Sequence, residues 1–213
     1  MPNTITPIAR GLRERKKLKT KEAIQREALR LFQERGYDET TIEQIAAAAD
    51  ISPSTFFNYF PTKEDLIIFD RYDPIFESFL MEMPNDGPLS ASIERALTML
   101  AGAFEADRDT ILVRSRLGLE IPEVRARFWS ELERAQNLFA GLIARRTGRN
   151  ASDFDIRVLA MVLVTAAFEA SVEWIRRGGE GDMFRLVKEA LDVSGVLGRL
   201  DALSQAEPAK PVS

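Results

Sequence analysis

Apolar positions recur every three or four residues along most of the chain, and short polar stretches separate these runs. Residues 42–49 give one clear stripe, formed by Ile42, Ile45, Ala46 and Ala49. This spacing is typical of an amphipathic helix. No segment alternates apolar and polar residues as a half-buried strand would. The pattern therefore predicts an all-α protein of about nine helices.

Glycine, proline and capping residues mark the expected ends of these helices. Gly36 ends the first helix. Thr62 caps the fourth, which Pro74 should bend or break. Ser152 and Asp155 cap the eighth. The helices that follow the fourth are expected at about residues 90–106, 110–119, 122–147, 152–178 and 182–200.

Residues 41–60 contain the signals of two short helices joined by a tight turn. Thr41 and Gln44, three residues apart, match a capping box. Asp50 belongs to a residue type that tolerates the left-handed conformation of a sharp turn. Ser52 then caps a second helix, and Pro53 occupies its first position, where the missing N–H has no cost. These features predict a helix-turn-helix, which implies binding to DNA.

In a helix-turn-helix, the early outward-facing residues of the second helix meet base edges in the major groove. Here those residues are Ser52, Pro53, Ser54, Thr55 and Asn58. Asn58 suits an adenine, whereas Pro53 or the methyl group of Thr55 suits a thymine methyl. Because this helix has no arginine or lysine, we expect extra specificity from the N-terminal arm or from DNA shape.

The phosphate contacts are expected at the helix ends, from the hydroxyls and the one cation found there. The residues with these groups are Thr41, Ser52, Tyr59, Thr62 and Lys63. The aromatic residues Phe56, Phe57 and Phe60 are assigned mainly to packing.

The charge of the chain is distributed unevenly. The formal net charge is −4, which alone argues against a nucleic-acid partner. Residues 1–35, however, hold ten basic groups against four acidic ones, a net charge of +6 that leaves −10 for the remaining 178 residues. A basic head on an acidic body can bind phosphates locally. The arginines Arg10, Arg13 and Arg15 either reach a minor groove or remain in solvent.

Residues 15–69 resemble the TetR family of bacterial transcriptional regulators. The matching motifs are Leu31-Phe32-Gln33-Glu34-Arg35-Gly36-Tyr37, Ile45-Ala46-x-x-Ala49, Ser52-x-x-Thr55-Phe56-Phe57-x-Tyr59-Phe60 and Lys63-Glu64-Asp65-Leu66. Asp50 departs from the usual glycine and Phe57 from a common tyrosine. The resemblance implies a dimer that binds a palindromic operator, represses transcription and is released by a small lipophilic ligand. It also makes Tyr59 and Lys63 the leading phosphate contacts.

The composition of the two ends and the resemblance together divide the chain into four regions. These are a flexible arm (1–13), a helix-turn-helix DNA-binding domain (14–61), a ligand-sensing and dimerisation domain (62–203) and a disordered tail (204–213). Within the third region, the helix from Ser152 to Arg177 is the best candidate for a homodimer contact. Its stretch from Leu159 to Ala170 is apolar and rich in small residues, which let another helix approach closely. The alternative is that this helix and the last one are simply core.

Candidate ligand-binding residues are large or polar side chains on otherwise apolar faces. They are Phe104, Arg114, Arg116, Phe128, Trp129, Asn137, Phe168, Glu169 and Trp174. Glu169 lies in an apolar helix, where a buried carboxylate would need a partner. That partner is either a ligand or, as the favoured alternative, an internal or cross-dimer ion pair. The two arginines near aromatic rings suit an amphipathic anion such as an acyl thioester.

Composition excludes several other classes. The chain has no cysteine and no histidine, which removes disulfides, the commonest metal ligand and the commonest general base. Glu120, Glu131 and Glu133 do not share one helical face, so neither catalysis nor a metal or cofactor is expected. With no uninterrupted apolar run of ~18 residues and no secretion signal, we expect no membrane partner and a cytoplasmic location. The remaining alternative is a helical adaptor whose basic arm binds acidic partners.

Overall fold

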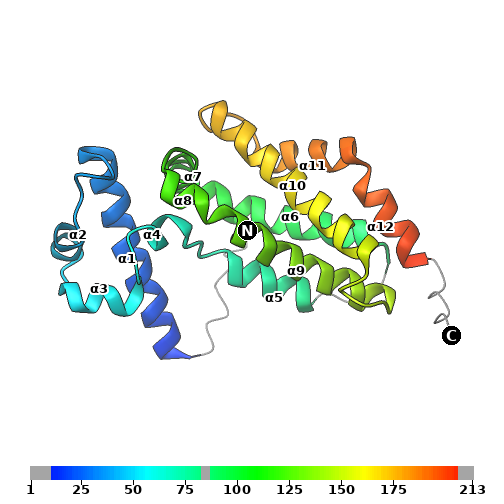
Figure 1. Cartoon of the computed structure of the whole chain (residues 1–213), viewed down its shortest axis with the longest axis horizontal. Helices are drawn as coiled ribbons and strands as arrows, with labels where there is room; N and C mark the ends of the chain where they lie inside the picture. Colours follow the sequence, from blue (N-terminus) through cyan, green and yellow to red (C-terminus); the bar gives the residue numbers. More distant parts are fainter. Residues whose placement is uncertain (1–10, 83–86, 206–213) are drawn as a thin grey trace. The chain divides into compact units, whose positions relative to one another are not determined.

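The computed structural model describes residues 11–82 and 87–205, and every regular element within them is an α-helix (Figure 1). The all-α class is confirmed. The helices are α1 (Leu12–Arg35), α2 (Ile42–Ala48), α3 (Pro53–Tyr59), α4 (Asp65–Ile68), α5 (Asp73–Glu82), α6 (Leu89–Ala106), α7 (Arg108–Glu120), α8 (Pro122–Ala126), α9 (Phe128–Thr147), α10 (Phe154–Arg176), α11 (Met183–Ser194) and α12 (Val196–Gln205).

The described residues form twelve helices rather than about nine because three of the expected helices are divided. α4 ends at Ile68, so the chain leaves the helix well before Pro74. This proline becomes the second residue of α5 and neither bends nor breaks a helix. The first turn of a helix tolerates proline because its N–H groups lack intrahelical partners. A break at Arg127 separates α8 from α9, and Gly195, with a left-handed φ of 64°, separates α11 from α12.

The start of α10 differs from the expectation. Asp153, and not Ser152, is its N-cap residue, and no side chain makes a capping hydrogen bond there. The Ser152 hydroxyl instead donates to Asn150 Oδ1 at 2.8 Å. Asp155 lies in the first turn of the helix and accepts two hydrogen bonds from Arg149. The side chains of Asn150 and Arg149 therefore hold the two groups that were expected to cap the helix, the Ser152 hydroxyl and the Asp155 carboxylate.

The chain divides into two compact units, each built from two stretches of sequence. The first unit combines Met1–Ile75 with Asp107–Ala126, and the second combines Phe76–Ala106 with Arg127–Ser213. The functional division expected between residues 61 and 62 stays a prediction.

In the first unit, α1 packs against α2, α4 and α7 around a small apolar core. The fully or almost fully buried side chains are Ile24, Ala28, Leu31, Phe32, Ile45, Ala46, Phe56, Phe60, Leu66 and Ile67. Burying each large side chain of this set contributes about 1.5–3 kcal/mol. This core fixes α2 and α3 against the middle of α1.

The link between α4 and α5 is held by polar contacts within the same unit. Gln25 on α1 is buried, and its Nε2 donates to the carbonyls of Leu66 at 2.7 Å and Phe69 at 2.8 Å. From α7, Arg114 Nη1 donates to the Phe69 carbonyl at 2.9 Å and Nη2 pairs with the Asp70 carboxylate. Because these donors satisfy the carbonyls at the end of α4, the helix can stop there without a glycine.

The second unit packs α9, α10 and α11 together with α6 and α12. Its largest buried side chain is Trp174, whose Nε1 donates to the carbonyl of Gly181 at 3.3 Å. Asp201 on α12 accepts hydrogen bonds from the backbone N–H of Ser90 at 2.9 Å and from its hydroxyl at 2.6 Å. This carboxylate ties the beginning of α6 to α12.

α10 is unusually apolar for a helix with an open face. An 18-residue window within Phe154–Arg176 has a mean hydropathy of 1.7. By length and composition alone, this helix could cross a membrane. Only 28% of that window is buried. Phe154 is 84% exposed and Val158 is 42% exposed. The helix therefore carries more apolar surface than its own unit covers.

Candidate nucleic-acid interface

The turn between α2 and α3 has the geometry that its sequence predicts. The backbone N–H of Gln44 donates to Thr41 Oγ1 at 3.3 Å, and the N–H of Thr41 donates to Gln44 Oε1 at 3.0 Å. Both halves of the capping box are thus confirmed. Asp50 has a φ of 53°, the left-handed conformation expected of it, and no other non-glycine residue described has a positive φ.

The beginning of α3 is capped as expected. Ser52 Oγ accepts from the backbone N–H of Thr55 at 3.1 Å, and Pro53 occupies the first turn. The same oxygen lies 2.8 Å from the hydroxyls of Ser54 and Thr55. These hydroxyls form an exposed polar group at the amino end of the helix.

Burial of one side of α3 determines which side remains open. Phe56 is fully buried and Phe60 is 1% exposed, so these two rings anchor the helix to the core. Ser54 and Asn58 are exposed, and Thr55 is partly exposed. Phe57 is less buried than its assignment to packing implies, because its ring is 52% exposed, although it packs edge-to-face with the Phe56 ring at 5.6 Å between centroids.

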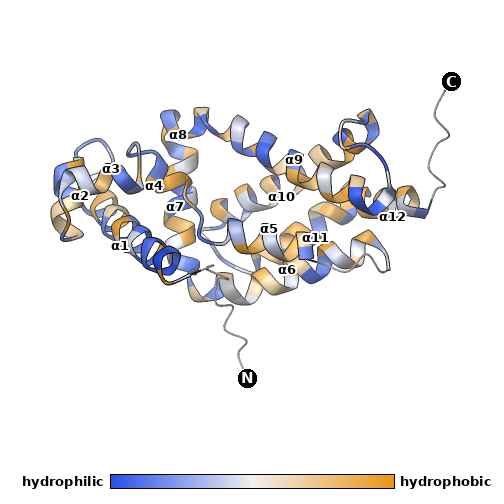
Figure 2. Ribbon diagram, turned by 90° about the horizontal axis from the view of Figure 1, so that it is seen from below, coloured by the Kyte–Doolittle hydropathy of each residue, from blue (hydrophilic) through white to orange (hydrophobic). Residues whose placement is uncertain are grey.

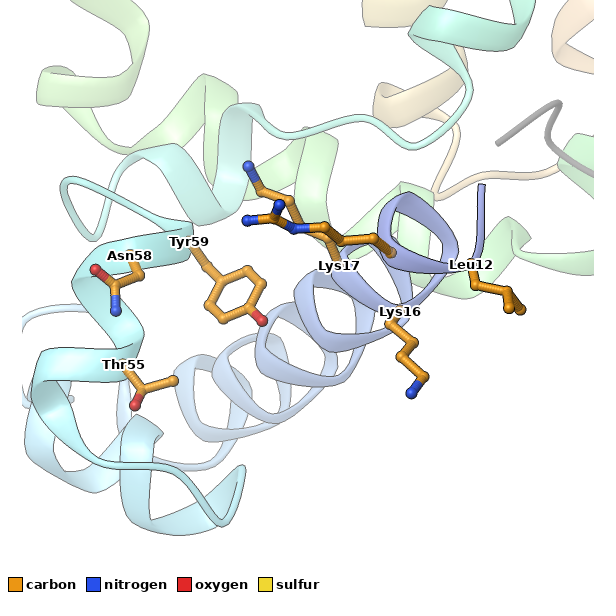
Figure 3. A pocket seen from close by; sticks show the side chains of 7 residues that line it. Leu12, Lys16, Lys17, Thr55, Asn58 and Tyr59 are labelled. Atoms are coloured by element: carbon orange, nitrogen blue, oxygen red, sulfur yellow. The ribbon is translucent and has the colours of Figure 1, made fainter. Parts of the chain in front are cut away.

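A groove of about 620 Å³ lies between α3 and the first turns of α1. Thr55, Asn58 and Tyr59 line one wall, and the Tyr59 ring points toward α1 (Figure 3). The other wall consists of Leu12, Arg13, Lys16 and Lys17. Figure 2 shows these first turns of α1 as strongly hydrophilic. One wall of the groove is therefore cationic and the other carries hydroxyl and amide groups.

Lys63 is held by a carbonyl cluster that sequence reasoning missed. Its Nζ donates to the backbone oxygens of Tyr37 at 2.7 Å and Thr40 at 3.2 Å. It also lies 3.9 Å from the centroid of the Tyr37 ring. The hydroxyl of that tyrosine donates to Glu64 Oε1 at 2.8 Å. The pKa of Tyr37 is raised mainly by burial of the phenol and, to a lesser extent, by this carboxylate. Since an ammonium has three hydrogens, one N–H of Lys63 is left for another acceptor.

Thr62 makes the expected local contacts, although the helix after it begins later. Its N–H and its hydroxyl donate to Asp65 Oδ2 at 2.9 and 2.8 Å. Glu64 is the N-cap position of α4, so Thr62 is not the cap residue itself. The first hydrogen-bonded turn instead precedes the regular helix.

The residues proposed for a ligand are divided between the two units. Arg114 belongs to the first unit, where Asp70 and the Phe69 carbonyl occupy its guanidinium. Four of the others, Arg116, Trp129, Asn137 and Glu169, are exposed.

Glu169 is not buried within the chain. Its side chain is 68% exposed and lies 3.8 Å from that of Arg176, two turns further along α10. An ion pair with Arg176 is thus present, whereas a contact of Glu169 with a ligand stays a prediction. An exposed pair of this kind contributes little to stability.

The four remaining candidates form two aromatic pairs in the second unit. Phe104 and Trp174 have ring centroids 5.7 Å apart, and Phe184 extends this pair at 5.3 Å from Phe104. Phe128 and Phe168 are 5.8 Å apart. Such edge-to-face contacts are typical of packed aromatic groups. Within the residues described, no group of three or more histidine, cysteine, aspartate or glutamate side chains could hold a metal ion.

Comparison with known proteins identifies both halves of the chain. Residues 24–68 match the model of bacterial regulatory proteins of the tetR family, and residues 87–195 match the MftR C-terminal domain. The HTH-type transcriptional regulator TcmR of Streptomyces glaucescens is 32% identical over 186 residues, which covers 81% of this chain and 80% of that protein. The putative mycofactocin biosynthesis transcriptional regulator MftR of Mycobacterium tuberculosis is 25% identical, over 84% of this chain and 89% of that protein.

A solved structure shows the same fold. The crystal structure of Thermus thermophilus FadR, a transcriptional repressor of the TetR family in complex with lauroyl-CoA, is 25% identical in sequence. The two superpose with a TM-score of 0.56 over 91% of this chain and 98% of that one. These similarities agree with the capped helix-turn-helix of α2 and α3, and the chain belongs to the TetR family of DNA-binding bacterial transcriptional regulators.

Proposed function

We propose that the protein is a cytoplasmic repressor that binds a palindromic operator as a homodimer and leaves it when a small lipophilic ligand binds. The observation that carries the proposal is the capped helix α3, which presents Ser54, Thr55 and Asn58 outward while Phe56 is buried. Family membership supports the regulatory role, and the FadR neighbour, a repressor, supports repression.

In this proposal, Ser52, Pro53, Ser54, Thr55 and Asn58 face base edges in the major groove. Asn58 is the residue with the most specific chemistry, since its amide can pair with both acceptor and donor of an adenine. Thr41, Tyr59, Thr62 and Lys63 contact phosphates. Lys63 contributes its third N–H, because the other two donate to the carbonyls of Tyr37 and Thr40.

The homodimer buries the open face of α10. The exposure of Phe154 and Val158, and the small buried share of this apolar helix, support a second copy of the chain as its cover. On α11, which packs against α10, Val193 is also 90% exposed. A two-fold dimer places two copies of α3 on the half-sites of a palindrome. In this proposal the apolar face of α10 serves dimerisation rather than contact with a membrane.

The ligand we propose is an amphipathic anion such as an acyl thioester. The FadR neighbour was solved with lauroyl-CoA, and the second unit of this chain has partly exposed aromatic rings that suit an acyl chain, at Phe104, Phe128 and Phe168. Ligand binding changes the DNA affinity only as far as the ligand prefers one of two conformations.

The test is selection of genomic DNA fragments by the purified protein, followed by titration of the enriched fragment. We expect a palindromic motif, a steep salt dependence of affinity, and release by acyl-CoA esters but not by free coenzyme A. A helical adaptor would retain no fragment above background and would show no such salt dependence. Absence of any enriched sequence would refute the proposal.

A further inference from the structure

The helix proposed to read the bases, α3, has no cationic side chain to contact DNA phosphates. α3 spans Pro53–Tyr59 and includes no lysine or arginine. Contacts to phosphates nevertheless supply a large share of affinity for DNA and make it depend on salt. Lys63 can serve at most one phosphate, because two of its three hydrogens meet backbone carbonyls. Further cations near α3 must come from another element.

The first turns of α1 supply these cations on the side that faces α3. Arg13, Lys16 and Lys17 line the groove opposite Thr55, Asn58 and Tyr59 (Figure 3). Their spacing of three and four residues places them on one face of the helix. None of the three side chains forms an ion pair with another described residue, unlike Arg26 and Arg30 further along α1.

We infer that this groove is a phosphate clamp, in which Arg13, Lys16 and Lys17 bind the sugar-phosphate backbone of the DNA strand that borders α3. The inference rests on the proposed DNA binding and adds α1 to the residues that perform it. From Arg13 to Lys17 the helix rises only about 6 Å, so the three cations lie close together along one helix face. Together they give this wall of the groove a concentrated positive charge that suits phosphates of the DNA backbone.

Tyr59 completes the clamp from the opposite wall. Its ring projects toward α1 (Figure 3). Among the residues that the structure describes, its hydroxyl has no hydrogen-bond partner. A free phenol next to cations is a suitable donor to a phosphate oxygen. The wall with Tyr59 belongs to the same helix as Asn58. The clamp thus fixes the position of α3 along the DNA, so that Asn58, next to Tyr59, meets the bases.

The groove concentrates like charges. Lys16 and Lys17 are adjacent, and Lys17 acts in turn on Lys21, whose pKa is lowered first by burial and then by this neighbour. Asp65 opposes that effect from α4. Repulsion among the cations is relieved when an anionic backbone occupies the groove. Removing one lysine should therefore leave the free protein as stable as before, or slightly more stable.

The test compares Lys16→Gln and Lys17→Gln with Lys19→Gln, a matched control on the same helix. Lys19 is exposed but does not line the groove. Affinity for the selected operator is measured at several salt concentrations. Each groove variant should reduce the slope of log affinity against log salt by about 0.9. At 0.1 M salt this corresponds to a loss of about tenfold. The control should keep the slope of the natural protein.

Sequence preference and stability distinguish a phosphate clamp from base recognition and from a purely structural role of these lysines. The groove variants should weaken operator and unrelated DNA to a similar extent, and their melting temperature should not fall. Tyr59→Phe, which removes only the hydroxyl, should weaken both DNAs several-fold. Equal slopes for the groove variants and Lys19→Gln would overturn the clamp while DNA binding stands. A wild-type protein that retains no DNA would overturn the proposed function and the clamp together.

Discussion

The guanidinium of Arg114 on α7 forms an ion pair with Asp70 and donates a second hydrogen bond to the Phe69 carbonyl. The side chains are only 13% and 24% exposed. This contact fixes the place where α4 ends, and α4 directly follows the helix-turn-helix. Pairs of this kind are costly to break from one side, because the remaining charge keeps no partner.

We therefore expect Arg114→Met to lower the free energy of unfolding by about 2 kcal/mol. Asp70→Asn should cost less, because its amide still accepts a hydrogen bond from the guanidinium. A double-mutant cycle with urea unfolding should give a coupling energy of about 1–2 kcal/mol. Additive effects of the two substitutions would show that the pair does not stabilise the link.

The left-handed turn residue gives a second prediction. Asp50 has a φ of 53° at a position where the family usually has glycine. Glycine adopts this conformation without a steric penalty, whereas a β-branched residue does so at a clear cost. We expect Asp50→Gly to raise the free energy of unfolding by about 0.5 kcal/mol and Asp50→Val to lower it by more than about 1 kcal/mol. Thermal unfolding of both variants measures the difference. A stabilising valine would contradict the assignment of this turn.

The success of sequence reasoning at this turn has a physical cause. Capping boxes, left-handed turn residues and proline in the first turn act between residues at most three or four positions apart. Thr41 with Gln44, and Ser52 with Pro53, therefore specify the ends of α2 and α3 without help from the rest of the fold. The same locality explains why the all-α class was predictable.

The contacts that were missed depend on residues far apart in the sequence. Lys63 meets carbonyls 23 and 26 positions away, and no local pattern marks them. Glu169 lies among apolar neighbours on α10, a setting in which a buried carboxylate would need a partner. In the single chain, however, the face of α10 that carries Glu169 is open, and this side chain is 68% exposed. Composition along one helix could not indicate which face the other helices would cover.

The carbonyl cluster around Lys63 leads to a third prediction. Lys63→Met keeps much of the aliphatic stem but removes the donors to the Tyr37 and Thr40 carbonyls. Because the site is partly exposed, we expect a loss of about 1–2 kcal/mol in the free energy of unfolding. If the third N–H meets a phosphate, the salt slope of DNA binding also falls by about 0.9.

Lys63→Arg is the informative control, since it keeps the charge but cannot reproduce the compact geometry of an ammonium. Its salt slope should match that of the natural protein while its stability falls. A stable Lys63→Met variant with a reduced slope would make this residue a phosphate contact only.

Base recognition by Asn58 is testable apart from phosphate contacts. Asn58→Ala should relax sequence preference at one operator position by about 1–3 kcal/mol and leave the salt slope unchanged. The measurement is competition among operators that differ at single positions. Ser54→Ala, the neighbouring exposed position on α3, should have a smaller effect because a hydroxyl discriminates bases weakly. Uniform weakening on all sequences would instead place Asn58 at the backbone.

The open face of α10 gives the last prediction. Val158 is 42% exposed and Phe154 is 84% exposed, so a charge introduced at Val158 costs little in a single chain. In a dimer that buries this face, the same charge would lose its water without gaining a partner. Val158→Arg should therefore convert the dimer to a monomer in analytical ultracentrifugation while the helical circular dichroism signal is retained.

Operator affinity should fall together with dimerisation, because a monomer occupies only one half-site. Thr98→Arg on α6, another exposed position, controls for added positive charge. Since extra positive charge by itself favours DNA, a loss of affinity in Val158→Arg alone has to come from the lost partner. A Val158→Arg variant that remains dimeric would move the dimer contact away from this face of α10.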